Sequence, residues 1–145
     1  MEKTKVLGLD LGEKRIGVAI SDDFRTIARG LGTIDVDGTE HEKIKGLVNQ
    51  YNVGKIIYGI PLKNDGSLSS RAEKMLSIIT RLKSIIKVEF IPWDERMTTV
   101  EAENILLMAD LSRKKRKKLR DKLAAQIILQ SYLDSLYLKD KTAEE

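Results

Sequence analysis

The sequence predicts an α/β domain built on a mixed five-stranded sheet that is flanked by helices. Short, almost continuous apolar runs separated by tight turns fill the first third of the chain, which is typical of strands joined as hairpins. Strand-length runs then alternate with amphipathic helical segments, which indicates crossover connections. The 145 residues are enough for one good core. We therefore expect a single domain over residues 1–138 and a polar C-terminal tail over 139–145.

The first three strands are expected to form a meander. Val6–Leu11 is almost wholly apolar, as in a strand buried on both faces. Gly12–Lys14 then forms a turn, and Arg15–Ile20 returns as the second strand. Ala28–Ile34 is a weaker third strand because two glycines interrupt it.

The rest of the chain alternates between helices and strands. Thr39 and Glu42 have the spacing of a capping box, which predicts that a helix begins there. Apolar spacing and further capping boxes predict, in order, the helix His41–Tyr51, the strand Lys55–Ile60, a helix that begins at Ser70, the strand Lys87–Trp93, a helix that begins at Thr98 and the final helix Leu119–Leu138.

The composition excludes several kinds of site. The chain has no cysteine, so disulfides, thiolate catalysis and cysteine-bound zinc are excluded. No apolar run approaches 18 residues and the N-terminus lacks a signal-like segment, so we expect a soluble, cytoplasmic protein without a membrane partner. The single histidine, His41, is expected to be a solvated residue at a helix start rather than a catalytic group.

The positive charge is concentrated in one segment. The net charge is +4, but Ser112–Lys122 alone holds eight basic residues and one acidic residue. The remainder of the chain is therefore mildly acidic. One strongly basic segment on such a body predicts contact with a polyanion such as nucleic acid.

Asp10 is the anomaly of the first strand. A carboxylate at the end of a buried strand costs several kcal/mol unless a cation meets it. Two explanations stay open at this point. Asp10 could cap the turn or pair with Lys14 or Arg15, or it could help to bind a metal ion.

Other acidic residues also fall at strand ends and helix starts. Asp94 and Glu95 end the fifth strand, and Asp121 lies near the start of the last helix, on the apolar face that includes Ala125. The helix dipole would favour an acid in this first turn, but it does not explain the apolar face. If these acids meet Asp10 at the carboxyl ends of the strands, they form an all-oxygen site suited to Mg²⁺ or Mn²⁺.

Four segments carry a resemblance to a known family. In order they are LGLDLGEKRIGVAISD, YGIPLKNDGSLSSRAE, DERMTTVEAE and DKLAAQIILQSYLD. Together they closely resemble the YqgF/RuvX family, and the resemblance spans nearly the whole chain. It implies an RNase H-like fold and the activity of a pre-16S rRNA nuclease or a Holliday-junction-resolvase-like protein.

The resemblance also implies a site. Asp10, Glu95 and Asp121 would be the catalytic, metal-binding triad. Asp94 is kept as a substitute for Glu95, because adjacent strand residues face opposite ways and the sequence does not choose between them. Two Mg²⁺ or Mn²⁺ ions about 4 Å apart are the expected cofactors.

Basic residues are the candidates for contacts with nucleic acid. Lys14 and Arg15 could hold a phosphate at the first turn or be solvated hairpin charges. Arg71 could grip a phosphate or be an ordinary first-turn residue, and Arg96 could pair with its acidic neighbours or with substrate. Trp93 is expected in the core rather than as a platform for base stacking. Six consecutive basic residues, called the basic block below, are expected to contact phosphates unless they form only a solvated surface: Arg113, Lys114, Lys115, Arg116, Lys117 and Lys118.

The leading interpretation is a metal-dependent nuclease that hydrolyses phosphodiester bonds of structured nucleic acid, in maturation of the pre-16S rRNA end during ribosome biogenesis. One alternative is a Holliday junction resolvase that acts on DNA four-way junctions. Another is a non-catalytic ribosome-maturation factor that binds nucleic acid. A phosphotransferase of the actin or sugar-kinase type is a further alternative, because Asp10–Gly17 also resembles the phosphate-binding hairpin of those proteins. It is disfavoured because those enzymes bind a nucleotide between two lobes and 145 residues supply only one.

These interpretations name different partners. Precursor rRNA, branched DNA and the precursor of the small ribosomal subunit are all candidates. The chain could act as a monomer or as a homodimer, because a resolvase that cuts two strands symmetrically would need a dimer, whereas RNA trimming would not.

Overall fold

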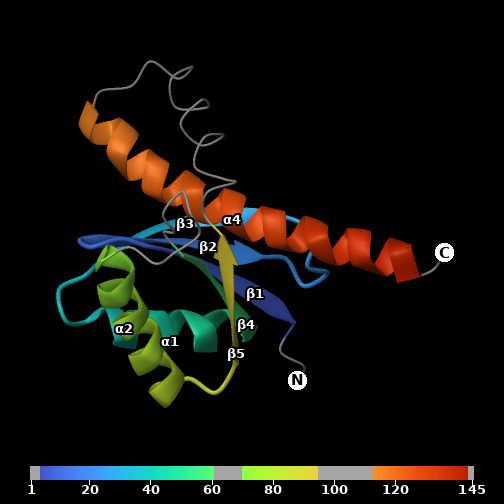
Figure 1. Ribbon diagram of the computed structural model, residues 1–145, viewed down its shortest axis with the longest axis horizontal. Coiled ribbons are helices and arrows are strands. Elements are labelled where there is room, and N and C mark those ends of the chain that lie inside the picture. Colours follow the sequence, from blue (N-terminus) through green and yellow to red (C-terminus); the bar gives the residue numbers. More distant parts are fainter. Residues whose placement is uncertain (1–3, 61–69, 95–112, 144–145) are drawn as a thin grey trace.

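A computed structural model of the protein describes residues 4–60, 70–94 and 113–143 (Figure 1). Its strands are β1 (Lys5–Leu11), β2 (Arg15–Ser21), β3 (Ala28–Asp35), β4 (Val53–Ile60) and β5 (Glu89–Asp94). Its helices are α1 (Glu40–Tyr51), α2 (Ser70–Ile85) and α4 (Arg113–Ala143). The helix that is predicted to begin at Thr98 lies outside the described residues.

The five strands form one mixed sheet in the order β3-β2-β1-β4-β5. β1 pairs antiparallel with β2, and β2 pairs antiparallel with β3. β1 pairs parallel with β4, and β4 pairs parallel with β5. The predicted mixed five-stranded sheet is therefore confirmed, with β1 at its centre.

Helices cover both faces of the sheet, and Figure 1 shows α1 and α2 on one side and α4 on the other. The larger core lies between the sheet and the α1/α2 pair, where every second residue of the central strands is a large aliphatic. Its fully buried members include Leu7, Leu9, Ile16, Val18, Ile44, Ile56 and Leu82. This alternation is the period-two pattern that the apolar runs predict.

Small residues line the face that α4 covers. A Cβ added to Gly8 of β1 would lie 2.8 Å from the Cβ of Leu129, and one added to Gly30 of β3 would lie 2.7 Å from the Cγ of Lys122. Glycine at these two positions therefore lets α4 approach the strands closely. The smaller core on this side is completed by Val6, Ala19, Ala28, Ile57, Ala125, Ile128, Leu129, Tyr132 and Leu133.

α4 is longer than the sequence predicts. It begins at Arg113 instead of Leu119, and it continues to Ala143, through most of the predicted polar tail. The apolar pattern begins only at Leu119, but lysine and arginine are themselves good helix formers and extend the helix beyond that pattern. Neither α4 nor any other helix in the described ranges combines the length and the apolar character needed to cross a membrane.

The start of α1 also differs from the prediction. Thr39 is the N-cap residue but makes no side-chain capping bond, and its hydroxyl donates to Asp37 Oδ1 at 2.6 Å. The predicted capping box with Glu42 is therefore wrong. His41 is buried, with 7% of its surface exposed, and its Nδ1 lies 3.6 Å from Glu40 Oε1. The expectation of a solvated His41 is wrong as well.

Candidate active site

Asp10 lies near the carboxyl end of the central strand, between two glycines. It is paired with Gly17 of β2 and with Gly59 of β4. Paired residues on neighbouring strands point to the same face of the sheet. The two positions directly beside the half-buried Asp10 therefore carry no side chain.

Asp10 points to the face of the sheet that α4 covers. Leu9 and Leu11, its neighbours in β1, belong to the core beneath α1 and α2. Val6 and Gly8, at the alternate positions, contact the α4 side. Because side chains alternate along a strand, Asp10 shares the face of Val6 and Gly8.

α4 runs antiparallel to β1. The amide N–H of Ala28, at the start of β3, donates to Gln130 Oε1 at 2.8 Å, whereas Gly30 packs against Lys122, which comes earlier in α4. The chain in α4 therefore runs opposite to β3. β3 is parallel to β1 because both pair antiparallel with β2. The N-terminal half of α4 thus lies toward the carboxyl end of β1 (Figure 1).

Asp121 lies in this N-terminal half of α4. It precedes Ala125 by about one turn. The backbone oxygen of Ala125 would lie 3.4 Å from a Cβ on Gly8, two residues before Asp10. The backbone therefore brings the positions of Asp121 and Asp10 to the same end of β1. The side chain of Asp121 lies outside the described residues.

The third carboxylate falls at the end of β5. Asp94 is the last residue of β5 and pairs with Ile60 of β4, one position beyond Gly59. Glu95 and the side chain of Asp94 lie outside the described residues. Within the described ranges, no three His, Cys, Asp or Glu side chains gather closely enough to hold a metal ion. The triad of Asp10, Glu95 and Asp121 thus stays a prediction.

The turn that follows Asp10 is tight. A Cβ on Gly12 would lie 2.5 Å from the backbone oxygen of Arg15, so this turn requires glycine. Lys14 is exposed at the turn, and its carbonyl accepts a hydrogen bond from the N–H of Val36 at 2.8 Å. Arg15 begins β2 and is half-buried. Both candidate phosphate contacts therefore lie on the hairpin that carries Asp10.

The other predicted cations are less completely described. Arg71 lies in the first turn of α2, but its side chain is outside the described residues, as is the whole of Arg96. The basic block forms the first turns of α4, and the described side chain within it, that of Lys115, is exposed. The block therefore lies on the helix that also carries Asp121.

Trp93 packs against α4. Its Nε1 donates to Ser131 Oγ at 3.2 Å, and its ring meets that of Tyr132 edge-on at a centroid distance of 5.6 Å. The expectation that Trp93 belongs to the core is confirmed. Gly59 was not identified from the sequence, although the glycine in the apolar run KIIYGI was a visible signal.

Comparison with known proteins gives a consistent assignment. The model of the RuvX family, described as Holliday junction resolvase, matches residues 4–135. A protein of Thermoanaerobacter pseudethanolicus is 48% identical over 134 residues, which cover 90% of this chain and 96% of that protein. A protein of Bacillus cytotoxicus is 44% identical over 135 residues, which cover 90% of this chain and 98% of that protein. Both carry the name "Putative pre-16S rRNA nuclease".

Solved structures show the fold. Thermus thermophilus RuvC in complex with a Holliday junction substrate matches with a TM-score of 0.57 at 17% identity, covering 92% of this chain and 96% of that one. The fowlpox virus resolvase with its substrate junction DNA matches with a TM-score of 0.58 at 16% identity, covering 91% and 98%. The predicted RNase H-like fold is thereby confirmed. With the family model matched over nearly the whole sequence, the chain belongs to the RuvX family, as its four motifs predict.

Proposed function

We propose that this protein is a divalent-metal-dependent nuclease that hydrolyses phosphodiester bonds in structured nucleic acid, with the end of precursor 16S rRNA as its substrate. The names of relatives at 48% and 44% identity support this substrate. The observation that carries the proposal is the placement of Asp10 between Gly17 and Gly59, at the end of the central strand. The cytoplasm as location and the small-subunit precursor as partner stay predictions.

The surroundings of Asp10 suit a hard cation and a phosphate. Carboxylate oxygens are the ligands that Mg²⁺ and Mn²⁺ prefer, and the glycines on both sides leave space for a bulky ligand. We infer that Asp10, Glu95 and Asp121 hold the metal. Two bound ions would supply an activated water and stabilisation of the leaving oxygen.

Alternation along β5 favours Glu95 over Asp94. Trp93 contacts α4, so it lies on the same face of the sheet as Asp10. Residues two apart in an extended chain share a face, whereas adjacent residues do not. This argument supports Glu95 as the metal ligand and Asp94 as the weaker choice.

The cations around this end of the sheet would position the strand to be cut. Lys14 and Arg15 lie on the hairpin next to Asp10, and we assign them to phosphate binding. We propose that the basic block holds more distant phosphates, with Arg71 and Arg96 as further contacts. Phosphate contacts of this kind position a substrate without reading its sequence.

A Holliday junction resolvase is the second candidate. The description of the family and the structural likeness to two resolvases solved with junction DNA favour it. Symmetric cleavage of a junction would need a dimer of this chain, whereas rRNA trimming would not. The phosphotransferase alternative has lost support, because these relatives carry nuclease or resolvase names.

A cleavage panel tests the proposal. Precursor rRNA, an unstructured single-stranded RNA and a four-way DNA junction are incubated with Mn²⁺ and with the parent protein, Asp10→Asn or Glu42→Gln. Asp10→Asn should lose at least ~10²-fold in rate, the scale for removal of one key electrostatic group. Glu42, an exposed acid in the first turn of α1 on the opposite face of the sheet, is the control and should retain the parent rate.

The panel also separates the two candidate functions. Cleavage of precursor rRNA without cleavage of the junction supports the proposed substrate, and the reverse result supports the resolvase. Circular dichroism shows whether each variant is folded. A folded Asp10→Asn protein with the parent rate would remove Asp10 from the catalytic site.

A further inference from the structure

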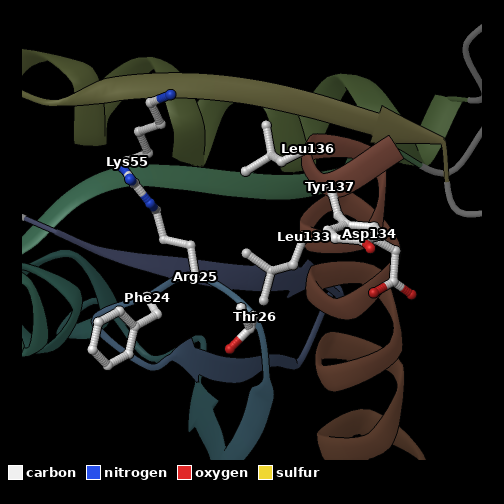
Figure 2. A pocket seen from close by; sticks show the side chains of 8 residues that line it. All are labelled: Phe24, Arg25, Thr26, Lys55, Leu133, Asp134, Leu136 and Tyr137. Carbon is white, nitrogen blue, oxygen red and sulfur yellow. The ribbon is translucent and has the colours of Figure 1, made fainter. Parts of the chain in front are cut away.

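The α4 side of the sheet is hollowed at the end opposite to Asp10. A pocket of about 650 Å³ is formed where the β2–β3 loop meets the C-terminal part of α4 and the start of β4 (Figure 2). Its volume is in the range of ligand pockets. Leu133 and Leu136 of α4 form part of its wall. Asp10, the proposed catalytic residue whose side chain the structure describes, does not line it, so the pocket is separate from the described part of the nuclease site.

Two exposed aromatic rings border this pocket. Phe24 of the β2–β3 loop has 84% of its surface exposed, and Tyr137 of α4 has 66% exposed. Large aromatic side chains are usually well buried, because burial of their apolar surface is favourable. Two such rings facing solvent at one pocket offer a flat apolar surface on which a planar group can stack.

Cationic groups lie at one end of the pocket. Figure 2 shows the side chain of Arg25 extending toward Lys55, while Asp134 lies at the other end beside Tyr137. Among the described residues, no hydrogen bond or ion pair engages the Arg25 guanidinium. Lys55 Nζ is 3.8 Å from a carboxylate oxygen of the exposed Glu89 and is itself partly exposed. At this end the Arg25 guanidinium is therefore open to an anion, and an anion bound there would share Lys55 with Glu89.

The loop that carries Phe24 and Arg25 is held in a fixed shape. The carboxylate of Asp22 accepts the backbone N–H of Thr26 at 2.7 Å and that of Ile27 at 3.1 Å. Gln130 ties the loop to α4, because its Nε2 donates to the carbonyl of Thr26 at 2.9 Å. A binding surface ordered in advance loses less conformational entropy when its ligand arrives.

We propose that this pocket binds a nucleotide unit, with the base against Phe24 or Tyr137 and the phosphate at Arg25 and Lys55. Exposed aromatic rings beside cations are the combination by which proteins bind single-stranded nucleic acid. The natural source of the unit is a single-stranded flank of the substrate, so this inference rests on the proposed nuclease function. A free nucleotide offers the same chemistry and is distinguished by the experiment.

The position of the pocket predicts a length requirement. Lys55 of β4 is paired with Val6 of β1. Val6 lies four residues before Asp10 in the same strand, and both residues are on the face that α4 covers. Four residues of a strand span about 13 Å, which corresponds to at least about four nucleotides of a stacked strand. A strand that reaches both Asp10 and the pocket must pass α4 and be longer than this. Very short oligonucleotides therefore cannot occupy both sites at once.

Direct binding tests the proposal without cleavage. A fluorescein-labelled single-stranded oligouridylate of about 12 nucleotides, several times the minimal span, is titrated in the presence of a chelator. Phe24→Ala should weaken its binding by at least about 5-fold, the loss expected for one stacked base. Arg25→Gln should lower the log–log salt slope by about 0.7, the value for one contact to a single strand.

Ile27→Ala is the matched control. Ile27 lies on the same loop and is 66% exposed, but it does not line the pocket. Its replacement should leave the affinity at the parent value. Photo-cross-linking of a 5-iodouridine oligonucleotide, followed by peptide mapping, should attach the base to the peptide that contains Phe24 or Tyr137.

The outcomes separate this proposal from the proposed function. Loss of cleavage in Asp10→Asn with unchanged oligonucleotide binding supports both sites. Displacement of the oligonucleotide by uridine monophosphate at a similar concentration would identify a free nucleotide as the occupant. Equal affinities for the parent, Phe24→Ala, Tyr137→Ala and Ile27→Ala would overturn the nucleotide pocket. So would a change in self-association by Phe24→Ala without any change in binding, which would identify a protein contact.

Discussion

The two faces of the sheet are built from different residues, although the same strands supply both. Toward α1 and α2, β1 presents Leu7, Leu9 and Leu11, all of them buried. Toward α4 it presents Val6, Gly8 and Asp10, and the neighbours of Asp10 on both sides are glycines. One face is filled with large side chains, whereas the other carries small residues around a single carboxylate.

This difference separates stability from chemistry along a single strand. Burial of large aliphatic side chains is the main favourable term in folding, so the α1/α2 face should carry much of the stability. On the α4 face, glycines stand where the other face has large aliphatic side chains, so less apolar surface is buried there. Gly8 lets the helix approach closely, and Gly17 and Gly59 place no side chain beside the Asp10 carboxylate. A substitution on the α1/α2 face of β1 should therefore reduce stability, whereas one at the neighbouring Asp10 should reduce metal binding and catalysis.

Leu9→Ala should give the largest loss of stability. Leu9 is fully buried, and removal of such a side chain leaves a cavity that costs about 2–5 kcal/mol. Urea denaturation of the parent, Leu9→Ala and Asp10→Asn in the presence of a chelator makes the comparison. The neighbouring Asp10→Asn should be at least as stable as the parent, because it removes a charge expected to repel the other acids. A clearly unstable Asp10→Asn would instead indicate that Asp10 is paired with Lys14 or Arg15.

Metal should stabilise the parent through the α4 face alone. A ligand that binds only the native state adds about 2.7 kcal/mol when its free concentration is 100 times its Kd. We expect Mn²⁺ to raise the melting temperature of the parent and of Leu9→Ala, but much less that of Asp10→Asn. Thermal melts at neutral pH with chelator and with millimolar Mn²⁺ measure this. An equal shift in all three proteins would indicate metal binding elsewhere.

Gly8→Ala tests whether the α4 face requires small residues. The added Cβ would lie 2.8 Å from the Cβ of Leu129, so α4 must shift, and overpacking of this kind costs about 1–3 kcal/mol. Gly46→Ala in α1 is the matched control. Nothing lies within 4 Å of a Cβ there, and alanine in a helix should add about 0.5–1 kcal/mol. Denaturation curves in which both variants change stability equally would contradict the proposed role of Gly8.

The sequence predicts the parts of this arrangement that depend on local periodicity. The alternation of β1 and β2 predicts both strands and which residues form the core. The lysines and arginines that precede Leu119 carry no apolar pattern, so the true start of α4 at Arg113 was missed. The predicted capping box did not form: the Thr39 hydroxyl is turned toward Asp37, to which it donates, and caps no helix N–H.

The site depends on information that one strand does not contain. Asp10 is recognisable because it is an acid in an apolar run. That Gly59 lies beside it follows from the register between β1 and β4, which are separated by more than forty residues. Register across a parallel crossover is set by packing of the whole sheet and cannot be deduced from either strand alone.

The basic block should affect binding without affecting the fold of either face. Replacement of Lys114, Lys115 and Lys117 by Glu should weaken binding of every nucleic acid. It should also flatten the log–log salt dependence by about 0.7–0.9 for each phosphate that the protein no longer neutralises. The control is replacement of Lys43 and Lys45 by Glu. Both are exposed on α1, which covers the other face of the sheet, and their replacement should leave the slope of the salt dependence unchanged. Equal slopes for all three proteins would mean that the basic block is only a solvated surface.

Asp22 provides the smallest test, because it is an aspartate with a structural role on the same molecule as Asp10. The backbone N–H of Thr26, with further hydrogen bonds from Ile27 N–H and the Thr26 hydroxyl, holds the pKa of Asp22 below its ordinary value of 3.8. A lowered native pKa means that the unfolded chain binds protons more readily. The stabilisation is therefore present above about pH 4 and is lost as the pH falls through the native pKa.

Asp22→Ala should remove that part of the acid dependence. We expect a loss of less than about 1 kcal/mol at neutral pH, because the residue is only partly buried and solvent screens its interactions. The difference in unfolding free energy between variant and parent should shrink as the pH falls from about 4 toward 2. Urea denaturation across this range measures it. Since Asp22 braces the loop of Phe24 rather than the end of β1, metal should still raise the melting temperature of Asp22→Ala by the parent amount. A variant that did not respond to metal would contradict the assignment of structural and chemical roles to these two aspartates.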